Sequence, residues 1–129
     1  MNAVDTNLLV RYLVQDDREQ AKRAERIIEG ESFLIVTTVL LETEWVLRGV
    51  YGYSPSQVGE ALGALIALPT VVMQAPETAV SALDLMSQGT DFADALHLAS
   101  ATSCETFYTF DKALVRRSKR QNGIRVAAP

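Results

Sequence analysis

Four polar residues between positions 89 and 111 have types and spacing that suit catalysis. Asp91, Asp94 and His97 fall in the first turns of a predicted helix, and Asp111 ends the apolar segment that follows. Asp94 has no Lys or Arg within four positions, so an ion pair along the helix does not explain its charge. Helix capping explains Asp91 well and Asp94 only partly. It explains Asp111 as readily as a functional site does, because Asp111 begins a further helical pattern. These residues alone leave both capping and a functional site open.

Two further acids stand out earlier in the chain. Asp5 ends a short apolar segment just before a helical pattern over residues 6–14, where a helix N-cap is again the alternative. Glu42 has apolar neighbours one turn away and no cation, so its carboxylate is costly unless it binds a metal or reaches water. Glu44 has Arg48 at i+4 and is interpreted as a surface residue. Asp5 and Glu42 are therefore the candidates.

The elements that must position these acids alternate between strand and helix. Apolar segments, several rich in β-branched residues, predict the strands. The predicted strands are residues 1–4, 32–38, 70–74, 105–110 and 124–129. No long polar linker or repeat interrupts the pattern, which predicts a single α/β domain over residues 1–129. We expect three layers, with helices flanking a short, mostly parallel sheet of four to five strands.

Such a sheet would gather the acids at one edge. The ends of parallel strands lie along that edge, so Asp5 and Asp111 can approach each other, and helices entering there bring Glu42 and Asp94. Four adjacent carboxylates repel one another unless a cation compensates their charge. Mg²⁺ or Mn²⁺ prefers oxygen ligands and commonly bridges carboxylates to phosphate. The chemistry that fits is metal-assisted hydrolysis of a phosphodiester.

Half of the chain's twelve cations lie between Lys112 and Arg125, a segment without acids. Four of them recur at i, i+4, i+7 and i+8 on one predicted helical face; these are Lys112, Arg116, Lys119 and Arg120. They could guide RNA phosphates towards the acids, and the alternative is a solvated face that balances an acidic protein. The net charge of −4 argues against wholesale non-specific binding to nucleic acid.

The composition fits a globular protein of the cytoplasm. Cys104 is the single cysteine, so the chain has no disulfide framework and no thiolate metal cluster. Asp5 interrupts the N-terminus before a signal peptide could form, and the longest apolar run is broken by Pro69 and too short to span a bilayer. We expect neither secretion nor membrane insertion.

Four segments together carry a family resemblance. They are VDTNLLV near the N-terminus, VLLETEWVL, DFADALHLASA and YTFDKAL. Each is weak alone, but their order and spacing over nearly all 129 residues resemble PIN-domain proteins, and more narrowly the VapC-type toxins of bacterial toxin–antitoxin pairs.

The resemblance implies roles for particular residues. The acids at the family's four metal-binding positions are Asp5, Glu42, Asp94 and Asp111. Residues at supporting positions are Thr6, Asn7, Asp91 and Thr109. His97 departs from the pattern, because relatives usually carry an aliphatic or small residue there, and its role stays open between a structural one and support of Asp94.

The resemblance also implies an activity and partners. The expected protein is an endoribonuclease that uses Mg²⁺ or Mn²⁺, forms a homodimer and, as a toxin, inhibits translation. A small VapB-like antitoxin would inhibit it by occupying the groove that leads to the acids, often with a cation inserted among them.

Two other functions are compatible with an α/β domain. A non-catalytic binding or regulatory module would use its acids only as helix caps. A phosphatase of the haloacid-dehalogenase kind needs a second acid two residues after the first, where this chain has Asn7. The phosphatase is therefore the weaker alternative.

Overall fold

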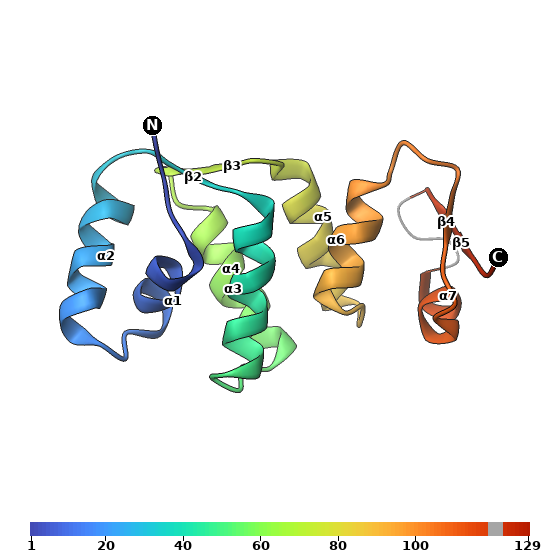
Figure 1. The fold of residues 1–129 in the computed structure, drawn as a ribbon, viewed down its shortest axis with the longest axis horizontal. Helices are drawn as coiled ribbons and strands as arrows, with labels where there is room; N and C mark the ends of the chain where they lie inside the picture. The colour runs from blue at the N-terminus through green and yellow to red at the C-terminus, as the bar shows by residue number, and fades with distance from the viewer. Residues whose placement is uncertain (119–122) are drawn as a thin grey trace. The chain divides into compact units, whose positions relative to one another are not determined.

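The computed structural model describes residues 1–118 and 123–129, and over these residues helices alternate with short strands (Figure 1). The helices are α1 (Thr6–Val14), α2 (Arg18–Gly30), α3 (Thr37–Gly49), α4 (Pro55–Ile66), α5 (Pro76–Ser87), α6 (Phe92–Ser100) and α7 (Lys112–Ser118). The strands are β1 (Asn2–Ala3), β2 (Phe33–Ile35), β3 (Val71–Met73), β4 (Thr106–Tyr108) and β5 (Arg125–Ala127). The predicted α/β class is confirmed.

The chain forms two compact units, residues Met1–Pro76 and Glu77–Pro129. In the first unit β1, β2 and β3 pair in that order, all parallel. The second unit contains the parallel pair β4–β5. The predicted strands thus form where they were expected, and the described residues distribute them over two small sheets, one in each unit.

The first unit builds its core around α1, which contacts both α2 and α3 (Figure 1). Leu9 and Val10 of α1 are buried, as are Phe33 and Ile35 of β2, whose alternate side chains face the core. The helix ends at Gln15, which adopts a left-handed conformation (φ 63°) and donates its backbone N–H to the Arg11 carbonyl. This short helix therefore carries residue 5 at its start and residue 11 in its last turn.

Helix α4 shows how the local sequence fixes an element boundary. Ser54 accepts a hydrogen bond from the Gln57 backbone N–H (3.1 Å), and the Gln57 side chain accepts one from the Ser54 N–H (2.8 Å). With Pro55 at the first helical position, this is a complete capping box. Val58, Leu62 and Leu65 form the buried face, as their helical spacing predicts.

In the second unit α6 begins at the predicted cap and α7 packs on β5. The buried residues of α6 recur at helical spacing, and Leu114, Ile124 and Val126 form an apolar cluster near the C-terminus. Gly89 precedes the start of α6 with φ 107°, a conformation that favours glycine. Its carbonyl accepts a hydrogen bond from Arg117 of α7, which ties the two helices together.

None of the helices in the described part of the chain is both long and apolar enough to cross a membrane.

Candidate active site

Asp5 is positioned by the strand-to-helix turn that follows β1. Its side chain accepts a hydrogen bond from the backbone N–H of Leu8 (Oδ1 to N, 3.0 Å), which makes Asp5 the N-cap of α1. Only one carboxylate oxygen is used in this way. The side chain is exposed, so its second oxygen is available to a ligand.

Glu42 projects from α3 towards the start of α1. The buried hydroxyl of Thr6 donates to Glu42 Oε1 at 2.5 Å, a charge-assisted hydrogen bond that orients the carboxylate. Asp5, Thr6 and Glu42 line one cavity of about 350 Å³ between α1 and α3. The structure therefore brings two of the four predicted acids together, and it gives Thr6 a supporting contact.

Glu44 differs from its predicted position. It does form the expected i,i+4 pair with Arg48 (Oε2 to Nε, 2.9 Å), but its side chain is buried rather than on the surface. The reason is that Arg48 provides the opposite charge within the same helix, which offsets much of the cost of removing the carboxylate from water. The pairing was predicted correctly and the exposure was wrong.

In the second unit two carboxylates, Asp91 and Asp111, and the side chain of His97 influence Asp94. The pKa of Asp94 is raised, first by partial burial and then by the negative charges of Asp91 and Asp111, while His97 acts in the opposite direction. These charges act on Asp94 from the same unit, so Asp94 and Asp111, separated by seventeen positions in sequence, interact electrostatically. His97 is exposed and lies one turn from Asp94.

Asp91 and Asp111 also act as caps. Asp91 accepts from the backbone N–H groups of Ala93 (3.1 Å) and Asp94 (3.4 Å) at the start of α6. Asp111 Oδ1 accepts from the Leu114 N–H (3.0 Å) at the start of α7. Thr109 accepts from the Asp111 backbone N–H (3.0 Å), so this hydroxyl orients the turn rather than the carboxylate.

The donor set suits a hard cation. Asp5 and Glu42 belong to the first unit, and Asp94 and Asp111 belong to the second. Within the described residues no three Asp, Glu, His or Cys side chains form a group that could hold a metal ion. Carboxylate oxygens are nevertheless the ligands that Mg²⁺ and Mn²⁺ prefer, and each unit supplies two of them.

The predicted basic face is described only in part. Lys112 and Arg116 are exposed on α7, whereas Lys119 and Arg120 lie outside the described residues.

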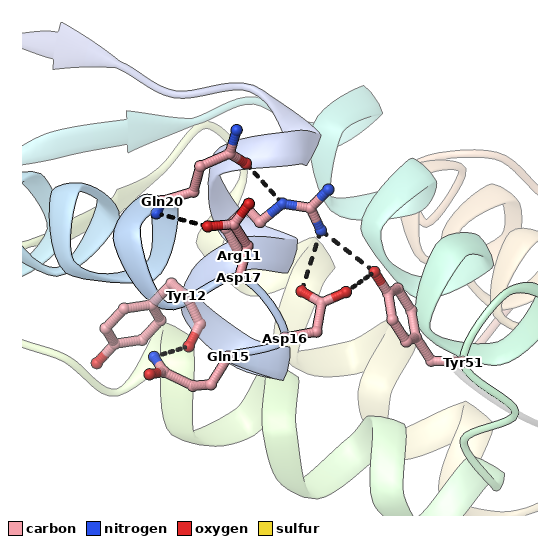
Figure 2. Close-up of polar contacts among 7 residues, drawn as sticks. All are labelled: Arg11, Tyr12, Gln15, Asp16, Asp17, Gln20 and Tyr51. Carbon is pink, nitrogen blue, oxygen red and sulfur yellow. Dashed lines mark hydrogen bonds and ion pairs between the residues drawn. The ribbon is translucent and has the colours of Figure 1, made fainter.

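Sequence reasoning missed Arg11, which lies in both cavities beside Asp5. Figure 2 shows its guanidinium held by three partners: Nε donates to Gln20 (2.7 Å), and Nη1 donates to Asp16 (3.1 Å) and Tyr51 (3.2 Å). Tyr51 in turn donates to Asp16 (2.8 Å), and this bond, together with the Arg11 charge, lowers the pKa of Asp16. The available signal was that Arg11 is the single charged residue of α1, one turn after Asn7.

The fold and these residues define an α/β domain that carries acids at its strand-to-helix turns and on the adjacent helices. A family model for the PIN domain matches residues 3–120, and the chain belongs to this family. PIN domains are generally nucleases that use divalent metal ions, so membership supports a nuclease function and nucleic-acid binding. No curated protein matches the chain.

Proposed function

We propose that the protein is a metal-dependent endoribonuclease and the toxin of a VapBC-type toxin–antitoxin pair. The observation that carries this proposal is the cavity in which Asp5 and Glu42 lie together, with Thr6 holding the Glu42 carboxylate. An exposed acid held by a buried hydroxyl is oriented towards a ligand rather than left to fluctuate in water. Because the chain belongs to a family of nucleases, we assign the oriented carboxylate to phosphodiester hydrolysis.

The proposed site joins Asp5 and Glu42 with Asp94 and Asp111 around Mg²⁺ or Mn²⁺. When bound, the ion would activate a water molecule and neutralise charge on the phosphodiester. Capping fixes Asp5 and Asp111 through one oxygen each, and Thr6 fixes Glu42. The pKa of Asp94 is raised first by burial and then by repulsion from Asp91 and Asp111, and a cation would relieve that repulsion.

The proposal includes cellular partners. RNA is the substrate, a small VapB-like antitoxin is the inhibitor, and the active form is a cytoplasmic homodimer whose cleavage of RNA inhibits translation. Trp45 is 57% exposed on α3 and offers an apolar anchor for such an interface. Light scattering that shows a monomer at working concentration would contradict the dimer.

The decisive experiment is incubation of the purified protein with total RNA in EDTA, Mg²⁺ or Mn²⁺, beside Asp5→Asn and Asp94→Asn variants. Asparagine caps a helix about as well as aspartate, so Asp5→Asn removes the charge while α1 keeps its cap. The matched control is Asp84→Asn, because Asp84 is exposed on α5 outside the proposed site.

We expect cleavage that needs a metal, persists in Asp84→Asn and is lost in both site variants, with circular dichroism unchanged. Cleavage that survives in Asp5→Asn and Asp94→Asn would show that the site is wrong.

One observation favours a second candidate, a binding module without catalysis. Asp5, Asp91 and Asp111 all cap helices, as such a module would require. Capping does not account for Glu42 or Asp94, which accept no hydrogen bond from a helix N-terminus among the described residues. A protein that neither cleaves RNA nor gains thermal stability from Mn²⁺ would favour the module.

A further inference from the structure

A second cavity lies on the other side of α1, between α1 and α2, with a volume of about 480 Å³. Five residues of α2 line it. Four of them recur at i, i+3, i+4 and i+7, and these are Gln20, Arg23, Ala24 and Ile27; the fifth is Arg26. One face of α2 therefore faces α1. Asp5 and Arg11 line this cavity as well as the one that contains Glu42, so the two cavities meet along α1.

The two cavities differ in the charge of their walls. The α1–α2 cavity has three arginines (Arg11, Arg23 and Arg26) and one acid (Asp5), a formal sum of +2. The α1–α3 cavity has one arginine (Arg11) and two acids (Asp5 and Glu42), a formal sum of −1. Asp5 and Arg11 are common to both cavities, so the difference in sign comes from Arg23 and Arg26 in the first cavity and from Glu42 in the second. An anion is therefore attracted to the first cavity and a cation to the second.

Arg23 and Arg26 are exposed and have no ion pair among the described residues. This is notable because Glu19 precedes Arg23 by four positions and Glu29 follows Arg26 by three, both spacings that allow pairs along a helix. The two guanidinium groups are therefore available to an external anion. The polar face of α2 therefore forms part of the wall of this cavity.

Arg11 is fixed before any ligand arrives. Its Nε and Nη1 donate hydrogen bonds to Gln20, Asp16 and Tyr51 (Figure 2), and among the described residues Nη2 donates none. The partners come from α2, from the turn before it and from the segment after α3, so the guanidinium is held from several elements at once. Because the planar guanidinium group is already oriented, it loses less conformational entropy on binding a phosphate oxygen than a freely rotating side chain does.

We propose that the α1–α2 cavity binds the backbone phosphates of single-stranded RNA and leads the strand to Asp5. Arg11 contacts the phosphate nearest the acids, and Arg23 and Arg26 contact phosphates further along the strand. The volume is that of a small-ligand site and suits a segment of one strand rather than a duplex. This inference rests on the proposed ribonuclease function and names the path of its substrate.

The test measures binding of a labelled, unstructured single-stranded RNA as a function of salt, in EDTA and on an Asp94→Asn background so that no cleavage occurs. The variants are Arg23→Gln and Arg26→Gln, alone and together. The matched control is Arg18→Gln, which removes the same charge from the exposed first residue of α2, outside the cavity. Glutamine retains good helix propensity, so α2 should persist.

We expect each cavity variant to reduce the slope of log K against log salt by about 0.7, and the double variant by about 1.4, because one phosphate contact is lost at each position. Arg18→Gln should leave the slope unchanged. Equal effects of all three single substitutions, or no effect of any, would overturn the proposal. Polyglutamate that competes as well as RNA at equal charge would also overturn it, since the cavity would then favour acidic peptides.

Failure of this inference is distinguishable from failure of the proposed function. If the otherwise unsubstituted protein cleaves RNA with metal and the cavity variants bind like Arg18→Gln, the path alone is wrong. If the cavity variants show the expected slopes but the protein does not cleave any RNA, the proposed RNA path is supported and the proposed catalytic function is contradicted. Absence of any RNA binding would contradict both the RNA path and the ribonuclease function.

Discussion

A carboxylate has two oxygens, and this explains how capping and ligand binding can coexist at the same residue. Asp5 and Asp111 each use Oδ1 to accept a backbone N–H at a helix start. The bond fixes the side chain through its first oxygen, and among the described residues the second accepts no hydrogen bond, so it can bind a ligand. In the sequence, helix capping and ligand binding were alternative roles for these acids. In the structure, the capping hydrogen bond orients the carboxylate, so one residue can have both roles.

Asp94 is the residue whose environment makes a pH dependence predictable. Its pKa in the folded protein lies above the ordinary 3.8, chiefly because of burial and the charges of Asp91 and Asp111. The folded state thus binds the Asp94 proton more tightly than the unfolded chain does, and stability is lost as pH rises through the interval between the two pKa values. At pH values above that interval, Asp94 is ionised in the folded protein, and its unfavourable environment lowers the free energy of unfolding by the full amount.

Asp94→Asn should therefore stabilise the metal-free protein at about pH 7, by less than about 1 kcal/mol because the site is partly solvent-exposed and screened. The gain should shrink near pH 4. Urea unfolding at both pH values in EDTA measures it, with Asp84→Asn as the control. Destabilisation by Asp94→Asn at neutral pH would mean that the carboxylate makes a favourable contact in the fold.

At the scale of elements, the boundaries followed from local chemistry. The helical pattern over residues 6–14 corresponds to α1, and Asp91, which capping explained well in the sequence, is the N-cap of α6. These features are encoded within a few residues, as caps and apolar periods. Glu44 and Arg11 escaped prediction because burial of one and orientation of the other depend on elements distant in sequence.

The contact between α1 and α3 gives a prediction at this scale. Thr6→Val removes the hydroxyl that orients Glu42, whereas Thr6→Ser keeps the hydroxyl and loses a methyl group. Both should cost about 1 kcal/mol in the free energy of unfolding, through the lost hydrogen bond or the lost apolar burial. If the proposed site is correct, only valine should lower RNA cleavage, by roughly 10- to 100-fold.

Steady-state cleavage rates and urea unfolding of the two variants separate the effects. Equal loss of activity in valine and serine would assign Thr6 to packing alone.

At the scale of the whole molecule, the central prediction is that all four proposed acids are needed for metal binding. Residues Met1–Pro76 supply Asp5 and Glu42, and Glu77–Pro129 supply Asp94 and Asp111, so neither unit contains the full set of four. The expectation of a single domain over residues 1–129 stays a prediction. The stability gained from a metal ion tests the contribution of each acid.

Mn²⁺ at about 100 times its dissociation constant should stabilise the protein by about 2.7 kcal/mol, a rise in Tm of roughly 10 °C for a chain of this size. Asp5→Asn and Asp94→Asn should each remove most of that rise, because each removes the charge of one of the four proposed metal ligands. If each unit held its own ion, each variant would remove only part of the rise and the double variant would remove the sum. Differential scanning calorimetry with and without Mn²⁺ distinguishes these patterns, and Asp84→Asn should retain the full rise. A partial loss in each single variant would therefore contradict the proposed four-acid site even if the protein were a nuclease.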